Sequence, residues 1–458
     1  MKPPKRGERR PWPVAPILLG ATALGCSRAD IQVLTLNGLA GDAGAADGGS
    51  RLAYCSPTGP ATILVGDGGA ICAQTFAREA FRFAVCTCGD FVASHAVTTD
   101  SFDGALGAYD PTLARVGGGV GTDGNLNASA TLDVGGSLWA GGTSGLTSNV
   151  PVTVEGELHS QGLVNIEQSL TVGTDAWLQG GLVTTGNVLI PGTLHIPSGA
   201  PLMVGGLQTI GTTATEPVSV PPPCDCADGA LLDIGAVVES YRAKNDDQAA
   251  GVDPGMLENV TATLSRELPC GRLFFTSVGA HAPIALTVSG RTAVFIGGDF
   301  VADSDVLLDV PEGGELDLFI EGNVLAAGQL QVGRTDNPAR ARVYVGGSGT
   351  VNLQNAAQLS GNLYAPKAEV VLGSTAPVTV FGAIFAGGLN AGSDLTVHFD
   401  ESVARDVGAC GPPSGACSSC RDCGNQACSA GVCGACLDSS QCCAPSVCRS
   451  SACVLDVR

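Results

Sequence analysis

The sequence is poor in charged residues, in aromatic side chains and in lysine. Only 14% of its 458 residues are charged and 5% are aromatic, whereas an average globular protein has about 25% charged residues. Lysine occurs only at Lys2, Lys5, Lys244 and Lys367, and the formal net charge is −20. A nucleic-acid-binding protein needs a positive field to neutralise phosphates. We therefore expect no nucleic-acid partner.

Long hydrophobic runs are also missing. The apolar run near the start, Pro13 to Leu24, is shorter than the about 20 residues that cross a bilayer. Glycine and proline are abundant instead, with 65 and 26 residues, and 44% of the chain is apolar. So much glycine excludes a coiled coil or a helical bundle. The apolar content is enough to bury a core, which excludes a disordered chain.

The first 25 residues have the pattern of an export signal. A basic start precedes the apolar run, which ends in Ala23-Leu24-Gly25-Cys26. This ending resembles a bacterial lipobox, in which the cysteine is acylated, although the usual first residue is Leu rather than Ala. We predict a lipoprotein signal peptide over 1–25, a lipid on Cys26 that binds the membrane, and a flexible tether over 26–54. An ordinary cleaved signal peptide is the alternative.

The 19 cysteines indicate an oxidising compartment. Setting Cys26 aside leaves seven in the body and eleven from Cys410 onward. Both sets are odd, so at least one bridge should join them, and Cys410 is the natural candidate. Iron–sulfur and zinc sites are weaker alternatives, because the tail has neither the right spacing nor a histidine. We predict disulfides for Cys55, Cys72, Cys86, Cys88, Cys224, Cys226, Cys270, Cys410, Cys417, Cys420, Cys423, Cys428, Cys433, Cys436, Cys442, Cys443, Cys448 and Cys453.

A strand-like phrase recurs between Asn125 and Gly211. It starts at Leu132, Val152, Leu170 and Val188, at intervals of 20, 18 and 18 residues. A second register, Gly145-Leu146, Gly162-Leu163 and Gly181-Leu182, has intervals of 17 and 19. Short strands with glycine at the bends and a period of this length are typical of a β-solenoid. Such turns stack about 4.8 Å apart and share one core.

A second, looser array is predicted from Thr292 to Glu401. Its repeating phrase is a glycine, a polar or small residue and an apolar residue, as in Gly298-Asp299-Phe300, Gly322-Asn323-Val324, Gly361-Asn362-Leu363 and Gly382-Ala383-Ile384. An Asp or Asn repeated at one corner indicates a stacked polar ladder in a solenoid bend.

Two helical segments accompany the arrays. Ala73 to Val85 places Phe76, Ala80 and Phe83 on one side, and predicts a disulfide-linked cap over 55–110 that covers an open end of the solenoid. Gly229 to Lys244 predicts a cysteine-linked helical insertion over 224–285. The arrays then occupy 111–223 and 286–409, and 410–458 is a small disulfide-rich module. The fold is predicted to be mainly β.

Several phrases resemble a known type of protein. They are Ser101-Phe102-Asp103, Gly136-Ser137-Leu138-Trp139, Leu316-Asp317-Leu318-Phe319, and above all Gly361-Asn362-Leu363-Tyr364-Ala365-Pro366 and Val397-His398-Phe399-Asp400-Glu401. Together they resemble an uncharacterised family of secreted, often lipid-anchored proteins of Gram-negative bacteria, whose body is similar to the polymer-forming, bactofilin-like β-solenoids. The resemblance spans residues 55–405 and implies a right-handed β-helix with a structural role. Bactofilins are cytosolic, cysteine-poor and without caps, so filament formation and catalytic residues are not carried over.

Motifs for catalysis are scarce. Gly119 to Gly124 fits G-x-G-x-x-G, but a dinucleotide site needs a helix after it, and here a strand is expected. Among five histidines, His398 is of interest because it shares one strand face with Asp400. This possible polar site suits metal binding or acid–base chemistry. The structural alternative is that both side chains solvate the outer face of a final strand or help to close the sheet.

Eight acidic residues and no basic one lie between Asp299 and Glu321. Oxygen-rich clusters can hold Ca²⁺, which makes Asp299, Asp303, Asp305 and Asp309 weak calcium candidates. They have no calcium-loop spacing, so a solvated acidic face is the favoured interpretation. We predict no catalytic residue, no cofactor and no metal.

These observations predict a non-enzymatic, lipid-anchored structural or adhesive protein of the cell envelope, outer membrane or extracellular surface, with a glycan or protein partner. One alternative is a carbohydrate-binding or polysaccharide-degrading β-helix protein, which acidic residues beside an arginine in an open cleft would favour. Another is a protease-inhibitor or toxin-like activity of the tail. Self-association is left open.

Overall fold

The computed structural model describes most of the body of the chain and little of its two ends. The described residues are 51–55, 62–64, 70–227, 230–355, 357–373, 376–404, 427–429, 432–434, 441, 446–449 and 452–455. The predicted signal peptide, Cys26, most of the tether and most of the tail, Cys410 included, lie outside them.

The body consists of short strands in two arrays. The first array has β3 (Val85–Thr87), β4 (Phe91–Ala93), β5 (Val97–Phe102), β6 (Val120–Thr122), β7 (Leu126–Ala128), β8 (Leu132–Val134), β9 (Leu138–Ala140), β10 (Leu146–Ser148), β11 (Val152–Val154), β12 (Leu158–Ser160), β13 (Val164–Ile166), β14 (Leu170–Val172), β15 (Ala176–Leu178), β16 (Leu182–Thr184), β17 (Val188–Ile196), β18 (Leu202–Val204) and β19 (Gln208–Thr215). The second array has β20 (Leu264–Leu268), β21 (Gly271–Phe275), β22 (Val278–Ala280), β23 (Ile284–Val288), β24 (Arg291–Ile296), β25 (Phe300–Ala302), β26 (Val306–Asp309), β27 (Glu315–Ile320), β28 (Val324–Ala326), β29 (Leu330–Gly333), β30 (Ala341–Val345), β31 (Thr350–Leu353), β32 (Ala357–Ser360), β33 (Asn362–Leu372), β34 (Val378–Phe381), β35 (Ile384–Ala391) and β36 (Leu395–Asp400).

Helices and further strands lie outside the arrays. They are α1 (Arg51–Tyr54), β1 (Thr62–Leu64), β2 (Ala70–Cys72), α2 (Ala73–Ala80), the 3-10 helix η1 (Gly104–Leu106), α3 (Ile234–Arg242), α4 (Asp247–Ala250), and the 3-10 helices η2 (Pro338–Arg340) and η3 (Glu401–Ala404). In the tail, the antiparallel pairs are β37 (Ala427–Ser429) with β38 (Val432–Gly434) and β39 (Ser446–Arg449) with β40 (Ala452–Leu455).

The arrays form one parallel β-solenoid of about 13 turns. Each turn contributes a strand to each of three faces, and strands of successive turns pair in register. Face 1 contains β8, β11 and β14, face 2 contains β9, β12 and β15, and face 3 contains β7, β10 and β13. Strand pairing continues face 1 through β5, β36, β34, β32 and β29. Face 2 continues through β6, β3, β35, β33 and β30, and face 3 through β4, β35, β33, β31 and β28. The predicted repeat starts, Leu132, Val152, Leu170 and Val188, stack on one another as expected. The second predicted register is off by one residue, because Leu146 and Leu182 flank Val164 rather than Leu163.

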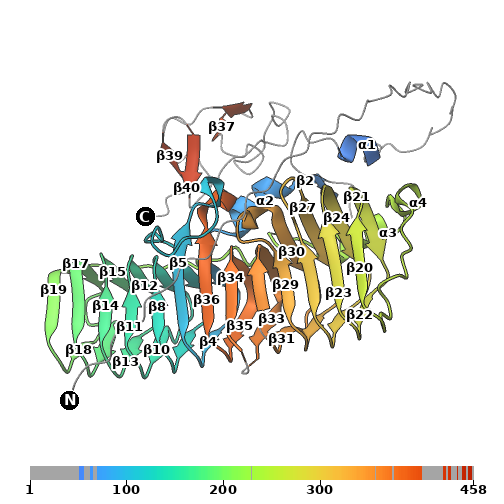
Figure 1. Cartoon of the computed structure of the whole chain (residues 1–458). Coiled ribbons are helices and arrows are strands. Elements are labelled where there is room, and N and C mark those ends of the chain that lie inside the picture. The colour runs from blue at the N-terminus through green and yellow to red at the C-terminus, as the bar shows by residue number, and fades with distance from the viewer. Residues whose placement is uncertain are drawn as a thin grey trace, which may run out of the picture. The chain divides into compact units, whose positions relative to one another are not determined.

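The order of the turns in space differs from their order in the chain. Winding begins in the middle of the solenoid at β3, proceeds to β19 at one end, and resumes at the other end with β20. It then returns to the middle, where β35 pairs with β3 and β4, and β36 pairs with β5. Figure 1 shows this join, which we call the seam, with the first array on one side and the second on the other.

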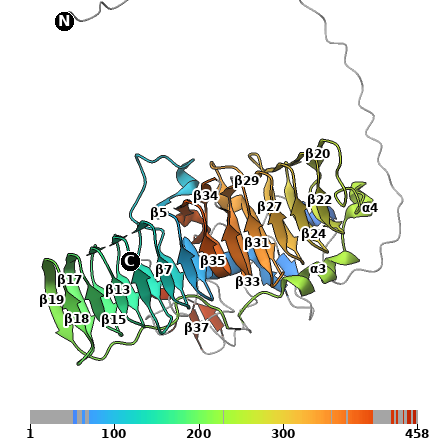
Figure 2. The ribbon, with the colours of Figure 1, turned by 90° about the horizontal axis from the view of Figure 1, so that it is seen from below.

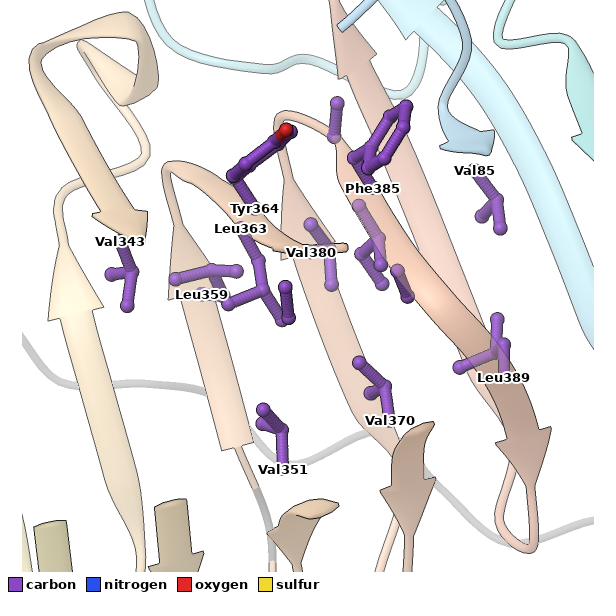
Figure 3. Packing of buried hydrophobic residues seen from close by; sticks show 14 of the residues in the cluster. Val85, Val343, Val351, Leu359, Leu363, Tyr364, Val370, Val380, Phe385 and Leu389 are labelled. Atoms are coloured by element: carbon purple, nitrogen blue, oxygen red, sulfur yellow. The ribbon is translucent and has the colours of Figure 1, made fainter. Parts of the chain in front are cut away.

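The apolar core continues through the seam without a break. Val351, Val370 and Leu389 of the second array line up with Phe91 of the first, and these side chains are buried. Figure 3 shows Val351, Val370 and Leu389 in one row across β31, β33 and β35, and Val85 of β3 beside Phe385, where Val85 continues the inward row of face 2. The last turn of the second array thus pairs directly with the first turn of the first array.

Residues 216–263 carry the chain from one end of the solenoid to the other. In Figure 2 this segment runs along the solenoid from β19 to α3. The predicted helix over 229–244 is observed as α3, where the Asp233 side chain accepts a hydrogen bond from the Ala236 amide at 3.0 Å. The second array begins earlier than predicted: β20 to β22 already form a turn inside the predicted insertion, because β20 pairs in register with β23.

The predicted N-terminal cap is not at an end of the solenoid. Its residues Val85–Phe102 form a regular turn, with β3 between β35 and β6, and α2 lies beside the seam. The predicted tether also ends earlier, since Arg51 of α1 donates to the carbonyl of Cys270 at 2.8 Å. From their place near the start of the chain, the cap and the tether were expected at an end of the solenoid. Instead, the cap lies in the middle of the solenoid, and α1 packs against the second array.

Three disulfides tie these segments to the solenoid. Cys55 pairs with Cys270, Cys86 with Cys224, and Cys88 with Cys226. These six body cysteines pair among themselves, and the side chain of Cys72, the seventh, lies outside the described side chains. The predicted bridge to Cys410 lies outside the described side chains.

The predicted corner ladder is present where its residues lie at a bend. The Asp299 carboxylate accepts from the Asn323 amide at 2.8 Å, and the Asn323 side chain accepts from the Gly349 amide at 3.0 Å. Asn362 does not belong to this ladder, because it is buried on face 2 opposite Arg342. Repeated side-chain-to-amide bonds of this kind hold the bends of successive turns together.

Candidate functional site

The outer side of face 2 carries one continuous row of mostly aromatic residues, which we call the aromatic ladder. By strand register it comprises Phe274, Phe295, Phe319, Tyr344, Tyr364, Phe385, Cys86, Gly121, Trp139, His159, Trp177 and His195. Most neighbouring rings stack, for example Phe319 on Tyr344 at 4.5 Å and Trp177 on His195 at 4.8 Å between centroids, whereas Tyr344 and Tyr364 meet edge-on. Ring faces that stack on one another do not offer a platform for a sugar, so we assign the ladder to packing.

In the second array, helices cover the aromatic ladder. Tyr241 of α3 stacks on Phe295 at 4.0 Å, and Phe76 of α2 meets Tyr364 edge-on at 4.9 Å. Phe295 and Tyr364 are each 1% exposed, so this part of the ladder is a second core outside the solenoid.

A buried ion cluster lies beside this part of the ladder. Arg342 donates to both oxygens of Asp317, at 2.5 and 3.0 Å, and to Glu315. Burial acts to lower the pKa of Arg342, but the two carboxylates outweigh it and raise that pKa. Burial acts to raise the pKa of Glu315, but Arg342 outweighs it and lowers that pKa. The pairing therefore keeps the guanidinium and Glu315 charged inside the protein.

In the first array, residues 216–227 cover the ladder, and we call this segment the strap. The Oε1 atom of its Glu216 lies 2.6 Å from Nδ1 of His195 and accepts a hydrogen bond when that nitrogen carries the proton. The Val220 amide donates to Gln179, and the carbonyl of Pro223 accepts from Arg82, both at 3.2 Å. Four prolines, Pro217, Pro221, Pro222 and Pro223, keep the strap extended and without amide donors of their own.

Two titratable groups of the first array are withdrawn from solvent, and one of them, Asp123, contacts the strap. His159 lies between Trp139 and Trp177 at 3.6 and 4.6 Å between ring centroids, and burial lowers the pKa of His159 to about 3. Asp123 accepts from the Cys224 amide at 2.9 Å, and burial raises the pKa of Asp123 to about 6. The imidazole is therefore neutral at pH 7, whereas the carboxylate is charged at some cost to stability.

At the seam, a polar cluster joins distant parts of the chain. The Nδ1 atom of His398 lies 2.7 Å from Asp100, Tyr109 donates to the other oxygen of Asp100 at 2.6 Å, and Tyr109 stacks on the imidazole at 3.7 Å between centroids. An Asp–His pair can support nucleophilic catalysis. Among the described hydrogen bonds none joins His398 to a serine, threonine or cysteine. The geometry therefore fits a structural role, in which His398 and Asp100 link β36 to β5 across the seam.

The structure does not bring His398 and Asp400 together. Asp400 is fully buried, and its Oδ1 atom accepts from the amides of Gly104 and Ser402 at 2.8 and 2.9 Å. Burial raises the pKa of Asp400. Asp100, which sequence reasoning missed, takes the place beside His398, because β5 pairs with β36 only in three dimensions.

The four weak calcium candidates have separate partners. Asp299 and Asp305 accept from the amides of Asn323 and Gln329, at 2.8 and 3.0 Å. Asp303 pairs with His281 at 2.7 Å, and Asp309 pairs with Arg334 at 2.5 Å. In the described part of the chain, no three His, Cys, Asp or Glu residues form a group that could hold a metal ion. Asp305 lines a surface pocket together with Thr263, Gln329 and Gln331, and the lining of this pocket contains no arginine.

The G-x-G-x-x-G phrase forms part of the solenoid. Its central residues belong to β6, and β7 follows it. A Cβ atom at Gly121 would lie 3.2 Å from Pro223 of the strap. The glycine therefore gives the strap room to cross the aromatic ladder, and no helix follows the phrase as a dinucleotide site requires.

The outer side of face 3 carries a row without any charged residue, which we call the face-3 stripe. By strand register it comprises Val301, Leu325, Asn352, Val371, Asn390, Val92, Asn127, Thr147, Asn165, Val183 and Met203. Asn127, Thr147, Leu325 and Met203 are exposed. In a chain with 43 acidic residues, an open and uncharged row spanning both arrays is a candidate binding surface.

Sequence reasoning missed the stripe, although a signal for it exists. Each member is the outward residue between two inward ones, as Asn127 is between Leu126 and Ala128. Aligning the turns of both arrays by their inward residues would have shown the uncharged row. Such an alignment would not have shown that the last turn of the second array pairs with the first turn of the first array.

Comparisons with known proteins identify one domain. A family profile described as "Domain of unknown function (DUF7305)" matches residues 232–405. This segment comprises α3 and the second array, and it ends next to η3 at the seam. No described helix is long and apolar enough to span a bilayer. No curated protein and no solved structure matches the chain significantly, and the likeness to bactofilin-like proteins stays a prediction.

Proposed function

We propose that this protein is a non-enzymatic scaffold of the cell envelope that adheres to an extended polysaccharide through its face-3 stripe. The stripe carries the proposal because it is open, uncharged and regular in a chain of net charge −20. Its side chains repeat at every turn, about 4.8 Å apart.

A neutral polysaccharide suits the chemistry of this row. The amides and hydroxyl of Asn127, Thr147 and Asn165 lie on three successive turns and can both donate and accept hydrogen bonds with sugar hydroxyls. Each contact is weak alone, but many contacts on a rigid row bind together with high effective concentration. A long polymer with its own repeat can use all of them.

A lipid on Cys26 would hold the scaffold at a membrane. This part of the proposal rests on the lipobox-like sequence Ala23-Leu24-Gly25-Cys26. Metabolic labelling with a palmitate analogue in a Gram-negative host tests it. Label in the wild type and none in Cys26→Ser is the expected result, and equal label in both would overturn the lipid anchor.

Co-sedimentation with insoluble polysaccharides tests adhesion. The probes are peptidoglycan sacculi, cellulose and chitin, and the protein is the Cys26→Ser full chain with its disulfides formed. The test variant is Asn127→Glu with Asn165→Glu, which places two charges on the stripe with Thr147 between them. We expect the wild type to pellet with at least one polymer and the variant to lose at least tenfold in binding.

The matched control is Gln331→Glu with Thr379→Glu. It places the same two charges on the outer row of face 1, with Gln358 between them, and should bind like the wild type. Adhesion through the stripe is refuted if the wild type pellets with none of the polymers, or if both variants lose binding equally.

A further inference from the structure

The two ends of the solenoid differ in how they are covered. At the end formed by β20, β21 and β22, residues 246–260 occupy the backbone groups of the outermost turn. The Asp246 and Asp247 side chains accept from the amides of Arg272 and Phe274, at 2.8 and 3.0 Å, and the carbonyl of Leu257 accepts from the Gly279 amide at 2.8 Å. The remaining edge strand, β20, carries the exposed charged residues Arg266 and Glu267, which discourage further pairing.

At the opposite end, no strand of the described part of the chain pairs with the outer edge of the last turn. Among the described strands, β18 pairs only with β16, and β19 only with β17. Met203 and Leu207 are 57% and 70% exposed. Leu202 and Ile210 are half-buried, whereas Leu182 and Ile190, their partners one turn inward, are fully buried. The turn therefore exposes both a cross-section of the core and a row of unpaired strand edges. Figure 1 shows β18 and β19 at this end.

This end is also free of formal charge. Between Asp175 and Glu216 the sequence contains no Asp, Glu, Lys or Arg, so the last two turns carry none. Two copies of a chain with net charge −20 repel each other over most of their surfaces. The uncharged end is where two copies approach without that cost, and it lacks the lysines and charges that normally protect an edge.

We propose that the open end is an interface between two copies of this chain, which meet end to end about a two-fold axis. A two-fold arrangement pairs the same patch on both copies and closes after two molecules. The covered end prevents the other possibility, in which each end binds the opposite end of the next copy. Because Gln208, Thr213 and Thr215 share the patch with Leu202 and Ile210, its composition is that of a reversible interface.

Sedimentation equilibrium of the Cys26→Ser full chain, with disulfides formed, tests the dimer. We expect a mass of two chains that falls twofold in Met203→Lys with Leu207→Lys, since four like charges then face one another. The corresponding Met203→Glu with Leu207→Glu variant should also be monomeric. Mixing the lysine and glutamate variants should restore the dimer, because opposite charges then meet across the interface.

The matched control is Leu106→Lys with Leu113→Lys, at residues that are 75% and 72% exposed near the seam, and it should remain dimeric. The tryptophan emission of every variant should match the wild type, which shows that the fold is kept. A monomeric wild type at every concentration refutes the proposal, as does a dimer indifferent to the end variants. Open-ended oligomers refute the closed dimer. A photoreactive residue placed at Leu207 gives a further test: a crosslink within its own chain would show that another segment covers the end, and would refute the interface. These outcomes are independent of polysaccharide binding.

Discussion

The two arrays share one aromatic ladder but cover it with different structures. Over the first array lies the extended strap, and over the second lie the helices α3 and α2. The strand lengths explain the difference. In the first array β9, β12 and β15 have three residues and one outward side chain each, so the ladder is one residue wide. In the second array β24 and β27 have six residues and several outward side chains.

Width decides which covering segment fits. A row one residue wide is covered by a single extended chain, whereas a six-residue strand presents a face comparable to a helix of about 10 Å diameter. The wider face also has outward positions beside the rings, which Arg342, Asp317 and Glu315 occupy. The arrays therefore depend on different interactions: disulfides hold the strap, whereas aromatic packing holds the helices over the second array, where a buried ion cluster joins β27 to β30.

Removing both strap disulfides should have the largest effect. Cys86–Cys224 and Cys88–Cys226 each close 138 residues, and once one is formed the other restricts the chain little further. We expect replacement of either pair by alanine to cost less than about 1 kcal/mol and replacement of both to cost about 4 kcal/mol of unfolding free energy. Urea unfolding measures these values, and an additive loss would contradict the shared-loop argument.

Tryptophan emission separates this effect from general destabilisation. The chain has three tryptophans, of which two, Trp139 and Trp177, lie in the ladder under the strap, and the third is Trp12 in the predicted signal peptide. Without both strap disulfides the emission of the native protein should shift to the red. Removing Cys55–Cys270, which ties α1 to the second array, is the control and should leave the emission unchanged.

Breaking the buried ion cluster should have the next largest effect. Arg342→Met leaves Asp317, which is 2% exposed, and Glu315 without their cation. Removing one partner of a buried pair costs about 3–5 kcal/mol, and we expect a loss near the lower value in urea unfolding.

Arg334→Met is the matched control for the ion cluster. Arg334 also holds both oxygens of one carboxylate, that of Asp309, at 2.5 and 2.7 Å, but its side chain is 44% exposed. Solvent screens this pair, so we expect little change in the urea midpoint. Equal losses in the two variants would show that the burial of Arg342 does not matter.

The sequence predicted the repeating turns but not how they join. Inward residues recur along the chain, so the stacking of Leu132, Val152 and Leu170 follows from local spacing. The seam depends on pairs such as His398 with Asp100, which are far apart in the chain and unrelated by any repeat. The cap was misplaced for the same reason: α2 precedes the first turn in sequence, but the second array already occupies the end that it was expected to cover. The face-3 stripe lay within reach of the sequence, because its residues obey the same period as the core.

The smallest expected effect concerns pH and two groups under the strap. Folding raises the pKa of Asp123 to about 6, from about 3.9 in an unfolded chain. Between these values the folded state binds more protons, so the Asp123 contribution makes stability fall as pH rises from 4 to 6. Folding lowers the pKa of His159 to about 3, from about 6.5. The folded state there binds fewer protons, so the His159 contribution makes stability rise with pH from 3 to 6.5.

The two contributions oppose each other between pH 4 and 6, and single variants should separate them. Asp123→Asn keeps an oxygen that accepts from the Cys224 amide. It removes the contribution of Asp123 that makes stability fall as pH rises. Its urea midpoint, relative to the wild type, should therefore increase from pH 4 to pH 6. His159→Phe keeps a ring between Trp139 and Trp177, and its relative midpoint should decrease over the same range. We expect each change to be about 1 kcal/mol, because Asp123 is only half-buried and His159 lies 3.0 Å from the Glu157 carboxylate, which favours the charged imidazole. Parallel pH profiles for the two variants would contradict the opposite pKa shifts of Asp123 and His159 on folding.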